Sequence, residues 1–369
     1  MVKLQKYNKA YKFLLLPSEE QEEQIIKTFG CCRKVWNELL NLAKKYYEEH
    51  KSLKIFTPKR IKEVFSYLYE IDSMALCNVQ MNLRKACNAF FKKNANFPKF
   101  KAKRDIRQSY TTNNGCNSVR IEGNKIRVPK IGLIKFIQHR ELKENEKIKS
   151  CTISKSPSGK YYISVLVEGD LEIVQIVAKP ENIIGLDFVM NGLFITNKGE
   201  KANYPRYYRK SEEKLDKLSR KVSQKKKGGK NRNKARLKLA RHHEHVANMR
   251  NDFLHKKSKE LADKHDAIAI ETLNMKGMSQ SLNLGKSVAD NGWGKFVGYL
   301  KYKLQIQGKQ LLQAPKNYPS SKLCSGCGVK DTELTLSDRI YNCKNCHLVI
   351  DRDLNASINI RIAGIARLA

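Results

Sequence analysis

Two pairs of cysteines in the C-terminal part of the chain constrain its fold more than any other feature. Two residues separate Cys324 from Cys327 and Cys343 from Cys346, and fifteen residues lie between the pairs. This spacing is typical of a zinc ribbon, in which two tight turns present four thiolates as a tetrahedron. Since four sulfurs leave no open coordination position, the expected zinc ion is structural. A redox-active dithiol or a chance pairing is the alternative, and His347 is a competing ligand.

The other six cysteines are scattered and lack the regular framework of a disulfide-bonded secreted protein. They are expected to be small buried side chains in a reducing cytoplasm. No apolar run reaches the roughly 18 residues that would cross a membrane, and the N-terminal segment lacks the length and cleavage signal of a secretory peptide. We therefore expect a cytoplasmic protein with no membrane partner.

The charge of the chain indicates the class of its partner. Lysine and arginine number 72 against 36 aspartate and glutamate residues, which gives a formal net charge of +36. Such an excess repels itself in a compact state, so a polyanion is the expected partner. Hydrophobic residues make up 41% of the chain, with 16 tyrosines and 13 phenylalanines, which excludes a wholly disordered basic tail. The composition predicts a folded protein that binds nucleic acid.

The first hundred residues combine a strand signal with a long helical pattern. An alternating segment ends at Pro17, and Ser18 with Gln21 forms the capping box that starts a helix. Apolar residues at helical spacing extend the helical block over residues 18–95. Three aromatic residues of this pattern are expected in the core: Trp36, Phe65 and Phe90.

Residues 97–180 have the alternation and the glycine-containing turns of antiparallel strands. Together with the strand before Pro17, they predict a small β-barrel that the helical block interrupts. From residue 180 the pattern indicates a new domain. Long basic helices are predicted there over residues 207–264, with a break at residues 227–230, and a further helix over residues 293–306.

The domain that begins near residue 180 carries acids on separate elements. Asp187 lies on the first strand of a predicted hairpin, Glu271 ends a short apolar strand, and the terminal helix adds Asp351 or Asp353. Buried carboxylates need cations, and two Mg²⁺ ions about 3.5–4 Å apart can activate water for phosphodiester hydrolysis. This order of elements fits an RNase H-like fold. A helix cap and a solvated strand end are the alternatives for Asp351 and Glu271.

Five segments resemble successive motifs of TnpB proteins, which are transposon-encoded, RNA-guided DNA nucleases similar to the smaller type V CRISPR effectors. They are FPKFKAKRDIRQSY, GLDFVMNGLFIT, AIETLNMKGM, NYPSSKLCSGCG and DRDLNASINI. The resemblance spans nearly the whole chain and implies a multidomain α+β fold. Its expected parts are an oligonucleotide-binding-like wedge β-barrel (residues 1–17 and 96–180), a helical recognition insert (residues 18–95), an RNase H-like RuvC α/β domain (residues 181–317 and 351–369) and a zinc ribbon insert (residues 318–350).

Carried over residue by residue, the resemblance makes Asp187, Glu271 and Asp353 the three RuvC acids, which hold two Mg²⁺ ions. Asp351 then becomes the helix cap, a choice that the residues alone leave open. The resemblance implies an active endonuclease that cuts double-stranded target DNA beside a short flanking motif. It also implies a guide RNA from the transposon end, with one protein copy per RNA. The family usually has glycine where His347 stands, which bears on the geometry of the second cysteine turn.

Basic tracts supply the expected contacts with nucleic acid. Their alternative is a solvated charged surface, but the net charge favours phosphate contacts. The predicted phosphate contacts are Lys99, Lys101, Arg104, Arg107, Lys226, Lys230, Arg232 and Arg236. By the resemblance, the flanking DNA motif is read where Tyr110, Thr112, Asn113 and Asn114 lie, since asparagine can pair with adenine edges and threonine can contact a thymine methyl group. An ordinary turn is the alternative for this segment.

Two rival functions share these features. A conventional transposase with an RNase H-like triad would bind element ends without RNA. A nuclease-inactive, RNA-guided DNA-binding repressor would keep the nucleic-acid contacts and lose the chemistry.

Overall fold

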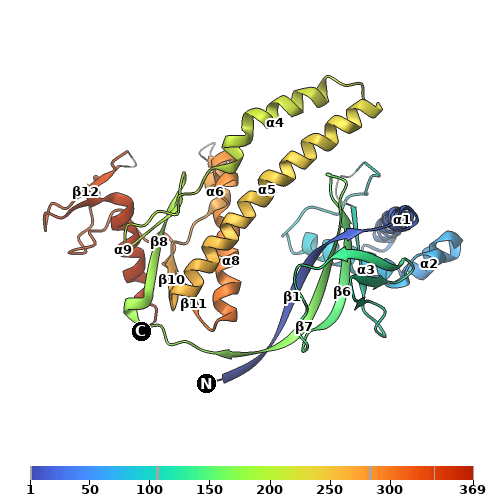
Figure 1. Ribbon diagram of the computed structural model, residues 1–369, viewed down its shortest axis with the longest axis horizontal. Coiled ribbons are helices and arrows are strands. Elements are labelled where there is room, and N and C mark those ends of the chain that lie inside the picture. The colour runs from blue at the N-terminus through green and yellow to red at the C-terminus, as the bar shows by residue number, and fades with distance from the viewer. Residues whose placement is uncertain (1, 105–107, 282–284, 336, 369) are drawn as a thin grey trace. The chain divides into compact units, whose positions relative to one another are not determined.

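The computed structural model describes residues 2–104, 108–281, 285–335 and 337–368, and it contains both α-helices and β-sheets (Figure 1). The chain divides into two compact units, one formed by residues 6–170 and the other by residues 1–5 with 171–369. The predicted division into four parts is finer than this and stays a prediction. Within the described residues, no helix is both long and apolar enough to span a membrane.

A seven-stranded sheet forms the β part of the 6–170 unit. Its strands are β1 (Val2–Leu16), β2 (Gln108–Asn113), β3 (Arg120–Glu122), β4 (Lys125–Val128), β5 (Gly132–Ile137), β6 (Lys147–Lys155) and β7 (Tyr161–Val174), in the order β2-β6-β7-β1-β5-β4-β3. Alternate residues of β1 are buried, among them Tyr11, Phe13 and Leu15, as expected for a strand with one face on a core. The predicted strands are confirmed. Closure into a barrel stays a prediction, because no pairing between β2 and β3 is present among the described residues.

The helical block lies between β1 and β2. It consists of α1 (Glu19–His50), α2 (Pro58–Val64), the 3₁₀ turn η1 (Ser66–Glu70) and α3 (Ser73–Phe91), and both α1 and α3 pack against β2. The capping box is confirmed, because the Ser18 side chain accepts from the Gln21 N–H and the Gln21 side chain accepts from the Ser18 N–H. Trp36 is buried and Phe65 packs against the core. The expectation for Phe90 is wrong: it is 37% exposed, since it lies in the last turn of α3.

A four-stranded sheet organises the other unit. Its strands are β8 (Ile183–Val189), β9 (Leu193–Thr196), β10 (Ala267–Ile270) and β11 (Gln310–Gln313), in the order β11-β10-β8-β9. β10 is parallel to both β8 and β11, whereas β9 is antiparallel to β8. The predicted hairpin and the predicted apolar strand before Glu271 are confirmed.

Alternate residues of the parallel strands face opposite helical layers. Ile184 and Leu186 of β8 share a core with side chains of α5 (Lys230–Lys264) and α8 (Trp293–Ile306). Ile183 shares a separate core with Ile360 of α9 (Arg352–Ile365). Since strand side chains alternate with period two, Asp187 faces the same side as Ile183, the side covered by α9.

The remaining elements complete this unit. They are the 3₁₀ turn η2 (Pro180–Asn182), α4 (Tyr207–Ser223), α6 (Met275–Ser281), α7 (Gly285–Asn291) and the ribbon strands β12 (Ile340–Asn342) and β13 (Val349–Asp351). α4 and α5 run side by side as a long hairpin (Figure 1). The predicted break at residues 227–230 and the helix over residues 293–306 are confirmed.

Candidate functional site

Three acidic side chains from separate sequence motifs come together where β8 and β10 end. Leu186 pairs with Ile270 in these parallel strands, so Asp187 and Glu271 follow at neighbouring positions. Asp353 lies in the first turn of α9, which packs against β8. Burial raises the pKa of Asp187 well above its usual range, and the charges of Glu271 and Asp353 raise it further. The three carboxylates therefore share one electrostatic site.

The geometry separates the two candidates for the third acid. Asp351 is the N-cap of α9, and its Oδ1 accepts hydrogen bonds from the backbone N–H groups of Asp353 and Leu354, each at 3.0 Å. Its carboxylate therefore satisfies the helix end. The Asp353 carboxylate instead lies 3.3 Å from the Arg352 guanidinium and raises the pKa of Asp187. Asp351 is thus the helix cap, and Asp353 belongs to the acid cluster.

The acid cluster has the donor atoms that a hard divalent cation prefers, because all its candidate ligands are carboxylate oxygens. Asp187 is only 8% exposed. Burial raises the pKa of Glu271 too, although a hydrogen bond with Ser320 acts against this. In the described part of the chain, the three acids do not bring their ligand atoms within 4.8 Å of one another. Among the described residues, the acids alone therefore do not form a compact single-ion cluster like that of the four cysteines.

A buried amide, which the sequence did not reveal, holds the turn that follows Asp187. Asn291 is 1% exposed, and its Nδ2 donates to the carbonyl oxygens of Val189 at 3.0 Å and Met190 at 2.9 Å. The neighbouring Asp290 accepts from the first backbone N–H groups of α4 and from Tyr204. These contacts fix the end of β8 and the start of α4. The only sequence signal is a pair of polar residues directly before the Gly292 turn.

The four predicted zinc ligands form one compact cluster. Their sulfur atoms all lie within 4.8 Å of one another, with 3.5 Å between Cys324 and Cys346 and between Cys327 and Cys343. Metal–sulfur bonds of about 2.3 Å in a tetrahedron give sulfur–sulfur edges of about 3.8 Å, whereas a disulfide would need about 2.05 Å. The cluster could therefore hold a zinc ion.

Electrostatics also favours a cation among these sulfurs. Hydrogen bonds from the Asn345 side chain and the Val329 backbone lower the pKa of Cys327 to about 6, so this sulfur is a thiolate at neutral pH. At Cys346 the Leu348 backbone acts in the same direction, but the other three sulfurs raise the pKa to about 12. Four thiolates therefore coexist only when a cation balances them.

His347 has the left-handed backbone conformation. This conformation explains why the TnpB family usually has glycine at this position. The φ of His347 is 59°, and the equivalent residue of the first cysteine turn, Gly328, has a φ of 75°. Both turns therefore need the left-handed conformation, which glycine adopts without strain. The His347 N–H bonds to the Cys343 carbonyl at 3.0 Å, so the turn closes with histidine present.

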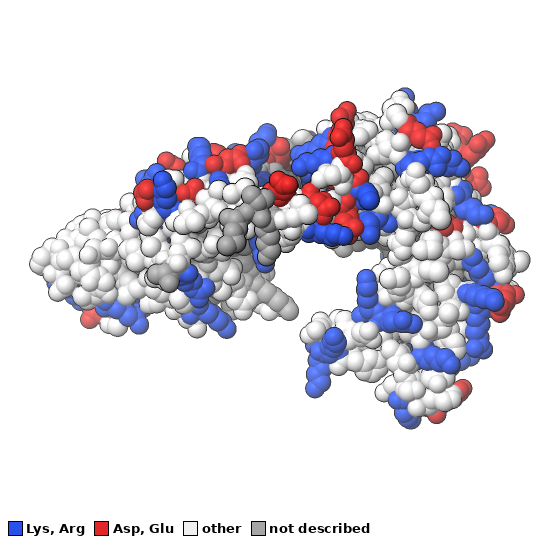
Figure 2. Space-filling view, turned by 90° about the horizontal axis from the view of Figure 1, so that it is seen from below, with Lys and Arg blue, Asp and Glu red and all other residues white. Residues whose placement is uncertain are grey.

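The predicted phosphate contacts divide into exposed and structural residues. Arg232 is structural, because its Nη1 donates to the carbonyl oxygens of Val222 at 2.7 Å and Lys225 at 3.0 Å and so closes the α4–α5 hairpin. Lys101 is exposed, and its ammonium nitrogen lies 3.9 Å from the centre of the Trp36 ring. Arg107 lies outside the described residues. The other predicted contacts are exposed, namely Lys99, Arg104, Lys226, Lys230 and Arg236. Figure 2 shows that basic side chains are spread over this face, with acidic ones among them.

The four predicted readers of flanking DNA are largely engaged in the fold. Tyr110 is 5% exposed and Thr112 is fully buried, with its hydroxyl donating to Asp72. Asn114 bonds to the Ile148 carbonyl and to the Val119 N–H. Asn113 accepts from Asn78 at 3.3 Å. Base reading by these residues stays a prediction. Thr112 and Asn114 have structural roles that local sequence could not show, because Asp72 and Ile148 are distant from them in the chain.

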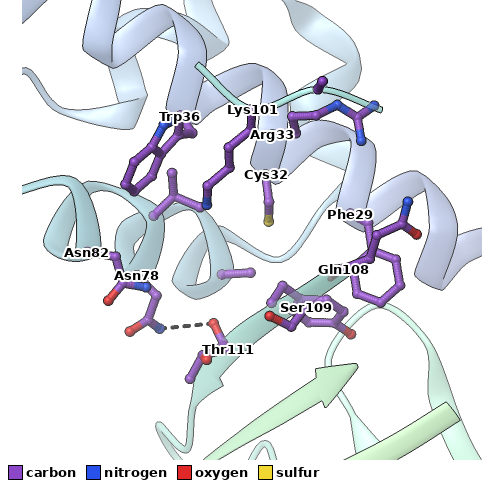
Figure 3. A pocket seen from close by; sticks show the side chains of 14 residues that line it. Phe29, Cys32, Arg33, Trp36, Asn78, Asn82, Lys101, Gln108, Ser109 and Thr111 are labelled. Carbon is purple, nitrogen blue, oxygen red and sulfur yellow. Dashed lines mark hydrogen bonds between the residues drawn. The ribbon is translucent and has the colours of Figure 1, made fainter. Parts of the chain in front are cut away.

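A cavity of about 350 Å³ lies beside these residues, between α1, α3 and β2 (Figure 3). Asn78 and Asn82 line it from α3, Arg33 and Trp36 from α1, and Lys101 from the segment before β2. The Asn78 amide donates to the Thr111 carbonyl at 3.0 Å. Asn82 is exposed. The missed signal was two asparagines four residues apart on α3, a spacing that places both on one helix face.

The fold and the site define a class: a strongly cationic α/β protein with an acid cluster suited to divalent cations and a four-cysteine ribbon. Three family models match the chain, described as "Probable transposase" (residues 162–282), "Cas12f1-like, TNB domain" (residues 293–360) and "Helix-turn-helix domain" (residues 7–52). In the last range the structure has β1 and the continuous helix α1, rather than two helices joined by a turn.

Similar proteins identify the family. A protein of Streptomyces pristinaespiralis, named "Putative RNA-guided DNA endonuclease", is 30% identical over 373 residues, which cover 99% of this chain and 92% of that protein. InsQ of Escherichia coli K12, with the same description, is 30% identical over 382 residues and covers 98% and 93%. A structure of a Cas12f1-sgRNA-target DNA complex matches with a TM-score of 0.56 at 12% identity, covering 96% and 99%, and shows the fold alone. The chain belongs to the TnpB family.

Proposed function

We propose that this chain is an RNA-guided DNA endonuclease of a mobile element. The observation that carries the proposal is the meeting of Asp187, Glu271 and Asp353 at the ends of β8, β10 and the start of α9. Its relatives of similar length are named RNA-guided DNA endonucleases. The presence of all three acids favours this function over a nuclease-inactive repressor.

The proposed chemistry takes place in a RuvC site of the RNase H-like type. The sheet order, with parallel strands bearing two acids and a covering helix bearing the third, supports this assignment. Asp187, Glu271 and Asp353 would hold two Mg²⁺ ions, which when bound supply activation of water and charge stabilisation at the leaving 3′ oxygen. Hydrolysis would leave 3′-hydroxyl and 5′-phosphate ends.

The chain's own residues give the acids their positions. The Asp351 cap starts α9 two residues before Asp353, and Asn291 holds the turn after Asp187. Asn355 and Asn359 of α9 donate to carbonyl oxygens in the segment that leads to the first cysteine turn, at 2.7–2.8 Å. The zinc ribbon is therefore attached to the helix that carries Asp353, and we assign zinc a structural role there.

The nucleic-acid partners follow from charge and shape. The exposed basic residues would contact the backbone of the guide RNA and of its hybrid with target DNA, while base pairing selects the sequence. The cavity beside α3 is a suitable place for a flanking base edge, because Asn82 presents an exposed amide at its wall. The proposed complex contains one protein copy per guide RNA and acts in the cytoplasm.

The test is cleavage by the protein purified with its RNA. We expect Asp187→Ala and Asp353→Asn to abolish cleavage while target DNA remains bound, whereas Asp351→Asn keeps a capping oxygen and continues to cut. Sequencing of the copurified RNA identifies the guide. Equal cutting by Asp187→Ala would refute the acid assignment, and a protein that cuts without any discrete RNA would support the conventional transposase instead.

A further inference from the structure

A lysine that the acid cluster does not include lies on the same face of the sheet as Asp187. Asp187 pairs with Ile195 in the antiparallel β8–β9 ladder, and Ile195 forms an antiparallel bridge with Lys201. Residues directly opposite in antiparallel strands place their side chains on one face. Strands are about 4.8 Å apart, so Lys201 lies about 10 Å from Asp187 across the sheet, within reach of a long side chain.

A cavity joins this lysine to the acid cluster. The hollow has a volume of about 390 Å³, and Lys201, Asn203 and Asp353 all line it. Gly192 of the β8–β9 turn forms part of its wall, where a side chain would narrow it. Lys201 and Asn203 are exposed. The hollow thus has a cation and an amide facing a carboxylate of the proposed nuclease centre.

The charge of Lys201 is available to a ligand. Across the described ranges, no carboxylate lies within ion-pair distance of its ammonium group. The two neighbouring charged residues, Lys198 and Glu200, are exposed and do not line this hollow. Lys198 therefore provides a matched exposed cation three residues away in sequence.

We propose that Lys201, with Asn203 beside it, binds the phosphate backbone of the DNA strand that enters the acid cluster. This inference rests on the proposed function and names a substrate contact of that site. Three clustered carboxylates repel a polyanionic strand, and a cation about 10 Å away offsets that repulsion for one phosphate. Lysine binds phosphate as a point charge, so no fixed geometry is needed. Asn203 adds a hydrogen bond to the same group.

The first experiment compares cleavage of target DNA by protein–RNA complexes. Lys201→Ala is expected to lower the cleavage rate at saturating target by about tenfold or more, the effect of one charge-assisted hydrogen bond. Lys201→Arg should keep most of the rate, because it keeps the charge. Lys198→Ala should stay within about twofold of the parent. Parent-like cutting by Lys201→Ala, or an equal loss in Lys198→Ala, overturns the proposal.

A second readout does not depend on cutting. The Asp187→Ala complex is treated with an acetylating reagent with and without target DNA, and lysine acetylation is measured by mass spectrometry. Bound DNA is expected to protect Lys201 severalfold and to leave Lys198 reactive. Equal reactivity of Lys201 in both samples overturns the proposal. A parent that never cuts, combined with a protected Lys201, would instead count against the proposed nuclease function and support the contact.

Discussion

Gly185 of β8 faces α9 at a distance that leaves no room for a side chain. A Cβ atom added there would lie 2.2 Å from the Ser357 carbonyl oxygen and 2.8 Å from the Arg361 nitrogen. Both are backbone atoms of α9, so rotation of a side chain cannot relieve the contact. We predict that Gly185→Ala displaces α9, lowers stability and nearly abolishes cleavage.

The magnitudes follow from these distances. Since real Cβ atoms essentially never lie closer than 3.0 Å to such atoms, the Ser357 carbonyl must move by about 0.8 Å. Overpacking of this kind costs about 1–3 kcal/mol. Asp353 lies one helical turn before Ser357, and a misplacement of about 1 Å at a reacting centre can reduce the rate about 100-fold. The activity loss should therefore exceed what partial unfolding explains.

A glycine in open space provides the control. Gly298 lies inside α8 and has nothing within 4 Å of an added Cβ. Alanine is the better helix former, so Gly298→Ala should raise the unfolding free energy by about 0.5–1 kcal/mol. The chain has two tryptophans, and a Trp36→Phe background leaves Trp293 to report on the unit that contains both glycines.

The assay is urea unfolding followed by Trp293 fluorescence, together with the cleavage rate of each complex at saturating target. The expected result is a loss of stability for Gly185→Ala and a gain for Gly298→Ala. Effects of the same sign in both variants would refute the packing argument. Parent-like cutting by Gly185→Ala would refute the link between α9 and the acid cluster.

Three further outcomes are expected. Cys327→Ser should remove zinc from the purified protein, measured by elemental analysis, whereas Cys116→Ser, at an exposed cysteine, should retain it. Asn291→Ala removes the hydrogen-bond donor of the Val189 and Met190 carbonyl groups and should cost about 1–3 kcal/mol, measured by urea unfolding. Glu146→Gln should lower the melting temperature at pH 7. Burial acts to raise the pKa of Glu146, but hydrogen bonds from two tyrosines and a backbone N–H outweigh it, so the pKa is lowered in the folded protein. The Glu146 carboxylate therefore stabilises the folded protein fully at pH values above its pKa in the unfolded chain. This stabilisation is lost as the pH falls through its pKa in the folded protein. The difference between parent and Glu146→Gln should therefore shrink below about pH 4; a constant difference would contradict this.

Features that depend on a few residues close together in the chain were predictable from the sequence. The Ser18–Gln21 capping box, the helix break at residues 227–230 and the four-cysteine cluster each depend on local spacing, and the structure shows all three. The acids were identifiable as candidates because a charge ends an otherwise apolar strand. Their meeting was predicted only by the family resemblance and not by local spacing, since it requires β8 and β10 to pair across the whole α4–α5 hairpin.

Side chains whose roles depend on distant partners were beyond local reasoning. Arg232 looked like one more exposed cation, but carbonyl groups at the end of α4 bind it. Thr112 looked like a base contact, but its hydroxyl faces Asp72 from before α3. Lys201 belongs to no recognisable sequence motif. Only the register of β8 and β9 shows that it lies on the same face of the sheet as Asp187. In each case tertiary pairing, rather than residue type, decides the role.

The junction between β13 and α9 has no linker. The last ribbon strand ends at Asp351 and the helix begins at Arg352, so only β13 separates the second cysteine turn from the helix that carries Asp353. An oxidant or chelator that opened the cysteine cluster would release the strand from which this helix starts. Thiol redox state and metal supply in the host cell would then govern how often the element damages DNA.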